Sequence, residues 1–132
     1  MRLLPDTNTL NYLLKGFQNV RGRFDEAVDR GDQFLLGSVV HYELTRYLHL
    51  KGSHRMMRAY EEITASWLRC SLSFEDWNES ARVWADRHRL GRAIADLDLF
   101  LAVLARRESL VLVTSNVAHF EGLDIPIENW MA

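Results

Sequence analysis

The chain has 132 residues, a formal net charge of −2 and 48% hydrophobic residues, as expected for one compact domain with its own core. This charge excludes bulk attraction to nucleic acid, so any contact with RNA or DNA has to be local. The single cysteine, Cys70, excludes an internal disulfide and fits a reducing compartment. We expect its thiol to be buried and unreactive. No apolar run approaches the ~20 residues of a membrane span, and too few residues precede Pro5 for a signal peptide. We therefore expect a single cytoplasmic domain over residues 1–132, without membrane contact.

Apolar periodicity predicts strands that alternate with helices along the chain. In the first half we expect a strand at 2–5, a helix ending at Gly16, a helix at about 20–30, a strand at 33–36, a helix at about 39–50 and a helix from Ser53 to Arg69. In the second half we expect a short extended link or minor strand at 70–72, a helix from Ser73 to about Leu90, an interior helix at 97–105, a strand at 111–114 and an edge strand within 125–130. This alternation favours an α/β domain with a mostly parallel sheet.

The first candidate site residue is Asp6, which ends the first expected strand and precedes Thr7 and Asn8. In open α/β sheets, ligands bind in the crevice at the carboxyl ends of the strands, which is where this carboxylate would point. The alternative is that Asp6 only caps the next helix. Thr114 and Asn116 follow the last interior strand in the same way, although a turn accounts for them locally.

Three further acids occupy unusual helical positions. Glu43 lies on the apolar side of its helix, where an ionised carboxylate is costly unless it is paired or bound to a metal. Alternatively, the apolar stripe is narrow and Glu43 lies at its solvent margin. Asp96 and Asp98 fall in the first turn of the most apolar helix, where carboxylates favour the macrodipole. This capping role accounts for Asp96, whereas the apolar neighbours of Asp98 leave it almost no solvated face.

An α/β sheet would bring Asp6, Glu43 and Asp98 to one edge. Carboxylates cannot share a crevice while ionised unless cations neutralise them, and an oxygen-rich site suits Mg²⁺ or Mn²⁺. Such a site supports metal-assisted hydrolysis of a phosphodiester. The ions are also needed for binding, because an acidic site repels a polyanion.

The same residues resemble the PIN-domain ribonucleases and, among these, the VapC toxins of toxin–antitoxin pairs. The resemblance covers nearly the whole chain in order, through Leu4-Pro5-Asp6-Thr7-Asn8, Gly37-Ser38 with Glu43-Leu44, Asp98-Leu99-Phe100-Leu101-Ala102, Leu112-Val113-Thr114-Ser115-Asn116 and Phe120. It implies a PIN-like three-layer sandwich with a parallel sheet of four to five strands, a Mg²⁺ or Mn²⁺ site, and cleavage of RNA. It also implies a homodimer and inhibition by a cognate antitoxin.

The resemblance also assigns roles to single residues. Asp6, Glu43 and Asp98 would be the principal acids, both catalytic and metal-binding, with Thr7 and Ser38 as polar neighbours that orient them. Thr114 and Asn116 would be further polar residues of the site. Asn116 lies where many PIN domains carry a fourth acid, which leaves a second metal position open unless Asp96 compensates.

Two other functions remain as alternatives. Asp6-Thr7-Asn8-Thr9 faintly resembles the haloacid-dehalogenase-like phosphatases, but Asn8 stands where those enzymes need a second aspartate. A PIN-like binding module that has lost activity is the non-enzymatic alternative, and Asn116 is its only support. Metal-dependent cleavage that is abolished in Asp6→Asn would favour the nuclease.

Several other side chains invite a functional interpretation. Arg46 and Arg92 are predicted to contact the RNA backbone. Trp77 and Trp84 are expected in the core rather than in a base-stacking platform. The five histidines share no ligand spacing, and we expect them at the surface or hydrogen-bonded rather than on a metal: His41, His49, His54, His88 and His119.

The helix from Ser53 to Arg69 carries more apolar surface than a peripheral helix usually buries. It either covers the chain's own core or binds a partner. With the resemblance, we expect a homodimer alone and a hetero-oligomer with the antitoxin. An antitoxin segment could dock an amphipathic helix in an apolar groove and direct a basic side chain into the acidic site.

Overall fold

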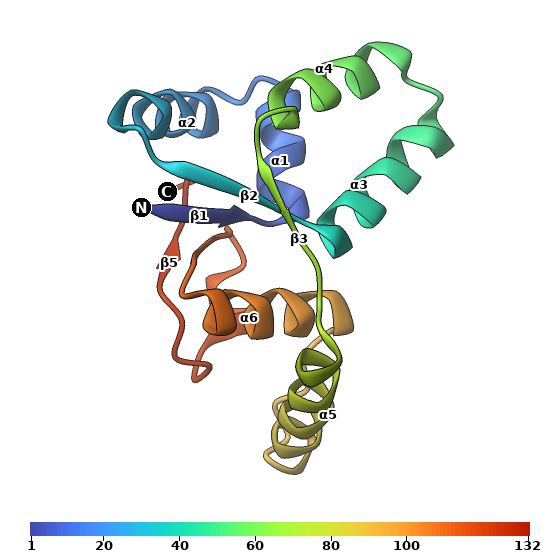
Figure 1. Cartoon of the computed structure of the whole chain (residues 1–132), viewed down its shortest axis with the longest axis vertical. Coiled ribbons are helices and arrows are strands. Elements are labelled where there is room, and N and C mark those ends of the chain that lie inside the picture. The colour runs from blue at the N-terminus through green and yellow to red at the C-terminus, as the bar shows by residue number, and fades with distance from the viewer.

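The computed structural model describes all 132 residues, and at its centre lies a five-stranded sheet in which every neighbouring pair of strands is parallel (Figure 1). The strands are β1 (Arg2–Pro5), β2 (Gln33–Gly37), β3 (Leu68–Cys70), β4 (Val111–Val113) and β5 (Ile127–Glu128), in the spatial order β3-β2-β1-β4-β5. In the central strand β1, Leu3 pairs with Phe34 of β2 and with Val111 of β4. The expected α/β fold with four to five mostly parallel strands is therefore confirmed.

Helices cover both faces of the sheet. They are α1 (Thr7–Leu14), α2 (Gln18–Arg30), α3 (Ser38–Lys51), α4 (His54–Thr64), α5 (Phe74–Arg89) and α6 (Asp96–Glu108), with a short 3₁₀ helix, η1 (Val117–Phe120), after β4. Helices α1 to α4 lie on one side of the sheet, and α5 and α6 lie on the other (Figure 1). This arrangement is the three-layer sandwich that the resemblance to PIN-domain ribonucleases implies. None of the helices is long and apolar enough to cross a bilayer.

The middle strands and α6 have almost entirely apolar sequences because they are buried in the core. Leu3, Leu4, Leu112 and Val113 are fully buried, because both faces of the sheet are covered. Residues 101–105 of α6 are also buried, since this helix lies between the sheet and α5. The expected interior helix at 97–105 is confirmed, and it extends beyond both predicted ends.

Helix α4 is shorter than the sequence predicts. It ends at Thr64 rather than Arg69, and β3 begins at Leu68 instead of Cys70. The reason is tertiary: Trp67 is buried and stacks on Phe34 with 5.0 Å between ring centroids, while Leu68 pairs with β2. Trp67 thus continues the apolar spacing of the helix although it lies outside it.

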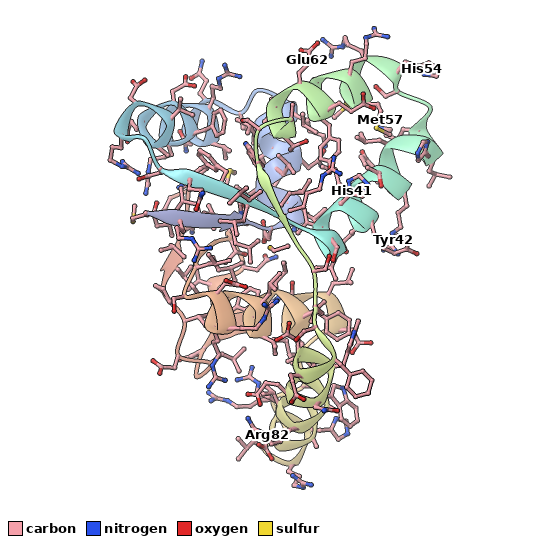
Figure 2. The ribbon with its side chains drawn as sticks, in the orientation of Figure 1. His41, Tyr42, His54, Met57, Glu62 and Arg82 are labelled. Carbon is pink, nitrogen blue, oxygen red and sulfur yellow. The ribbon has the colours of Figure 1, made fainter.

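The apolar face of α4 covers mainly the chain's own core. Tyr60 is buried, and Met56, Met57 and Ile63 are half-buried and pack against the core cluster. Met57 lies on the side of α4 that faces α3 (Figure 2).

The prediction that Trp77 and Trp84 lie in the core is wrong, because they are 47% and 44% exposed. Helix α5 buries a narrower stripe, formed by Asp76, Ser80 and Val83. Asp76 forms an ion pair with Arg107 of α6, with 2.9 Å between Oδ2 and Nε, so a polar contact holds α5 against α6. The two tryptophans flank the stripe and remain half in solvent.

Candidate active site

A cleft of about 900 Å³ lies at the carboxyl edge of the sheet. The segment after β1, the middle of α3, the start of α6 and the turn after β4 all contribute to it. Seven of the predicted site residues line it: Asp6, Thr7, Glu43, Arg46, Asp96, Asp98 and Asn116. The chain thus brings acids from three separate elements to one cavity.

Asp6 lines this cleft as a buried carboxylate with both oxygens hydrogen-bonded. It is 4% exposed, and its Oδ1 accepts a hydrogen bond from the Thr9 amide at 2.8 Å, which caps α1. Its Oδ2 accepts a hydrogen bond from the Thr114 hydroxyl at 2.6 Å. Burial raises the pKa of Asp6 above its ordinary value, and the nearby charge of Asp98 adds to this effect, while the hydrogen bonds oppose it. Asp6 is therefore both a helix cap and a buried carboxylate of the cleft.

Asp98 lies in the first turn of α6, and its side chain is 22% exposed. Its Oδ2 lies 3.0 Å from Nδ1 of His119, which belongs to η1. This contact was not predicted, because 21 positions separate the two residues and only the turn after β4 brings them together. Of the other histidines, His41 is hydrogen-bonded to the Tyr60 hydroxyl at 2.6 Å.

Glu43, in contrast to the buried Asp6, is partly open to solvent. Its side chain is 33% exposed, so it lies at the solvent margin of α3 rather than in the core. Nη2 of Arg46 lies 3.9 Å from its Oε2, and the Arg46 guanidinium also lies over the Tyr42 ring at 5.0 Å. Tyr42 projects outward from α3 (Figure 2), so this group of side chains is open to water. Arg46 is the one basic side chain that lines the cleft.

Two oxygen atoms of α1 are buried without a hydrogen-bond partner: Oγ1 of Thr7 and Oδ1 of Asn11. Both residues line the cleft, and their spacing of four positions places them on the same face of the helix. Asn11 was missed by the sequence analysis, although this spacing from Thr7 is a signal that could have found it. Buried polar atoms without partners are costly, and here they mark a place where a ligand or water can bind.

Three predicted residues do not line the cleft. Thr114 lies behind it, fully buried, and links Asp6 to the amide of Asn116, which donates to the Thr114 hydroxyl at 3.0 Å. Ser38 is exposed at the first position of α3. Arg92 lines a second, smaller cavity.

The donor set fits Mg²⁺ better than a cation that needs a full protein cage. No three acidic, histidine or cysteine side chains lie close enough together to bind one ion. Mg²⁺ usually binds through one or two carboxylates, retains several waters and takes further oxygens from phosphate. Asp6 and Asp98, with the unpartnered oxygens of Thr7 and Asn11 nearby, are compatible with that mode.

No family model and no curated protein matches the sequence. The structure, in contrast, is similar to solved structures. A chain of VapBC-1 from nontypeable Haemophilus influenzae superposes with a TM-score of 0.83 at 24% identity, over 100% of both chains. A chain of DNA-bound VapBC from Salmonella typhimurium gives 0.81 at 23% identity, over 98% of each chain. A toxin–antitoxin complex from Klebsiella pneumoniae gives 0.75 at 18% identity, over 97% of each chain. The protein therefore has the PIN-like α/β fold found in these complexes.

Proposed function

We propose that the protein is a metal-dependent endoribonuclease of the VapC kind, which hydrolyses phosphodiester bonds in RNA. The observation that carries this proposal is the acidic cleft. In it, the buried carboxylate of Asp6 lies beside Asp98 at the carboxyl edge of a parallel sheet, and Glu43 lines the same cavity. The structural similarity to chains of toxin–antitoxin complexes supports the toxin function by analogy of fold.

The residues of the cleft suit this reaction. When bound by Asp6 and Asp98, Mg²⁺ or Mn²⁺ would lower the pKa of a water nucleophile and offset the charge of the phosphate. The Thr9 amide and the Thr114 hydroxyl keep the Asp6 carboxylate in one orientation. We propose that Arg46, which lines the cleft and is partly exposed, binds a phosphate oxygen of the substrate.

Cleavage by the purified chain tests the proposal. An end-labelled RNA is incubated with the protein in Mg²⁺, in Mn²⁺ and in EDTA, beside Asp98→Asn prepared in the same way. We expect cleavage only with a divalent ion and only by the wild type. Cleavage that persists in EDTA or in Asp98→Asn would identify a different site or a contaminating nuclease.

The binding of the ion has its own test, which does not depend on activity. Calorimetry with Mn²⁺ on the wild type and on Asp98→Asn should give clearly weaker binding to the variant. Equal affinity would contradict the assignment of Asp98. A protein that binds Mn²⁺ and RNA but never cleaves would instead be the binding module that Asn116 suggests.

We propose further that an antitoxin segment inhibits the enzyme by occupying the cleft. Beside its acids, the cleft has an apolar wall that includes Leu44, Tyr47 and Leu50, and Leu50 is 87% exposed. An amphipathic helix with one basic side chain fits both features, because its apolar face covers this wall while its charge meets the carboxylates. Co-purification with the product of an adjacent gene, and loss of cleavage in that complex, would support this proposal.

We also propose that the chain forms a homodimer through the exposed apolar side chains of α5. Phe74 is 80% exposed, and Trp77 and Trp84 are half-exposed on the same helix. Apolar side chains gathered in this way are typical of contact surfaces. Light scattering tests the assembly: a monomer at tens of micromolar would exclude the dimer and leave the nuclease proposal unaffected.

A further inference from the structure

A second cavity, of about 380 Å³, adjoins the acidic cleft and has the opposite character. It is lined by Arg87, Arg92, His119 and Glu121, together with Ile94 and small residues. Ala95 lines both cavities, and His119 lies against Asp98 of the acidic cleft. A chain of phosphates that crosses the acidic cleft can therefore reach this second cavity directly.

The end of α5 brings the two arginines together. Gly91 adopts a left-handed conformation with φ of 69°, and the Arg92 amide donates a hydrogen bond to the Arg87 carbonyl at 2.9 Å. Their side chains then converge over Gly122. A methyl group added at that glycine would lie 3.6 Å from Nη1 of Arg87 and 3.7 Å from Nη1 of Arg92. Both guanidinium groups therefore lie within 4 Å of one point beside Gly122.

Neither guanidinium forms an ion pair with an acidic side chain, unlike two other arginines nearby in the chain. Arg82 and Arg89, on the same helix, form ion pairs with Glu79 and Asp86. Arg87 instead donates to the backbone carbonyl of Glu121 at 2.7 Å, and its Nε is buried without a partner. Arg92 forms no side-chain hydrogen bond or ion pair.

Glu121 lines the same cavity but forms no ion pair with either arginine. Like charges repel, so two converging guanidinium groups without an ion pair favour an anion between them. Guanidinium groups bind phosphate oxygens through two parallel hydrogen bonds, and the unpartnered Nε–H of Arg87 is a suitable donor. The cavity is large enough for such a group. These features point to an oxyanion.

We propose that Arg87 and Arg92 form a phosphate-binding site, which holds a backbone phosphate of the RNA next to the one in the acidic cleft. This inference rests on the proposed function for the identity of the polyanion. Free phosphate has the same chemistry, and the experiment below separates the two sources.

The test measures RNA binding in Mg²⁺ with Asp6→Asn present in every protein compared, so that cleavage is suppressed. Fluorescence anisotropy with a labelled RNA oligonucleotide compares this parent with the same protein carrying Arg92→Ala or Arg92→Glu. The matched control is Arg89→Ala, because Arg89 is the last residue of α5, three positions before Arg92, is 75% exposed and is paired with Asp86. The Arg92 side chain forms no hydrogen bond or ion pair, so its substitution should not disturb folding. Arg87→Lys is a second variant, which keeps the positive charge but loses the paired N–H donors of the guanidinium group.

We expect Arg92→Ala to weaken RNA binding roughly tenfold and Arg92→Glu to weaken it further, as for the loss of one charge-assisted contact. The slope of log K against log salt should fall by about 0.7, the value for one phosphate on a single strand. Arg89→Ala should change neither quantity. Arg92 variants that bind like the Arg89 control would overturn the proposal.

Titration of the wild type with inorganic phosphate, followed by the NMR signal of the Arg87 Nε–H, identifies the source. If phosphate shifts this signal while Arg92→Ala leaves RNA affinity unchanged, the assignment to RNA is overturned in favour of free phosphate. Because all these measurements are made without cleavage, failure of the nuclease assay leaves them interpretable. Conversely, normal RNA binding by the Arg92 variants leaves the proposed nuclease intact.

Discussion

The two walls of the acidic cleft hold their carboxylates in different ways. On the sheet side, Asp6 is 4% exposed and accepts two hydrogen bonds, from the Thr9 amide and the Thr114 hydroxyl. On the helix side, Glu43 is 33% exposed, and its only partner is Arg46 at 3.9 Å. The first wall is fixed before any ligand arrives, whereas the second can rearrange around one.

The two carboxylates also differ in their expected effect on the stability of the folded protein. A buried carboxylate favours the protonated form, so keeping Asp6 ionised at neutral pH costs the folded state free energy. A bound cation would offset that cost. The exposed pair of Glu43 and Arg46 contributes little in either direction, because water screens it. The sheet wall is therefore where the proposed activity and the stability of the protein oppose each other.

The largest expected effect is on cleavage by Asp6→Asn. Removing the charge of this carboxylate should weaken binding of the ion and reduce cleavage by at least roughly 10²–10³-fold, as when one fixed electrostatic group is removed from an active site. Cleavage of an end-labelled RNA measures it, with Glu61→Gln, an exposed residue of α4, as the control. Residual cleavage near the wild-type rate would place the metal elsewhere.

The same substitution should stabilise the protein in the absence of divalent ions. Because the pKa of Asp6 is raised above 3.8, wild type and Asp6→Asn should have similar stability at pH values below 3.8. As the pH rises through the raised pKa, the wild type loses stability, so the advantage of Asp6→Asn should grow toward pH 7. Urea unfolding of both proteins in EDTA at several pH values measures this difference. An advantage that shrinks with rising pH would mean that the folded state favours the ionised form.

Thr114→Val tests the hydrogen bond from the Thr114 hydroxyl to Asp6. Valine has nearly the same shape but leaves Asp6 Oδ2 and the Asn116 amide without their shared partner. We expect a loss of about 1–3 kcal/mol in the free energy of unfolding, together with slower cleavage. Thr114→Ser keeps the hydroxyl and should restore cleavage, although it loses a buried methyl group. If Thr114→Val cleaves like the wild type, the hydroxyl does not orient Asp6.

The sheet wall was largely predictable from the sequence. Asp6 follows an apolar strand, and the rule that parallel strands present their carboxyl ends at one edge places its side chain in the crevice. The other wall was harder to predict, because helical periodicity puts Glu43 on an apolar face without showing how wide that face is. The four-residue spacing of Thr7 and Asn11 is a further sequence signal for this site, because it places both side chains on one face of α1.

Other features depend on tertiary contacts that no local pattern encodes. His119 meets Asp98 only because η1 folds back over the start of α6. Arg87 and Arg92 are brought together by a helix end and a glycine 30 or more positions away in the chain. Trp77 and Trp84 have the spacing of core residues, but the ion pair between Asp76 and Arg107 anchors a different stripe of α5.

The smallest expected effect belongs to Glu43→Gln, and it measures the contrast between the two walls most directly. Its carboxylate is partly exposed, so water can replace part of what it does. We therefore expect cleavage to fall about tenfold rather than by the larger factor for Asp6→Asn. Stability should change by no more than about 0.5 kcal/mol, because an exposed ion pair contributes little. Cleavage assays and urea unfolding beside Glu61→Gln provide both numbers. A loss of cleavage as large as that of Asp6→Asn would mean that the exposed wall is fixed once RNA and metal are bound. In that case the solvent access of the Glu43 carboxylate in the free protein would be lost in the complex with RNA and metal.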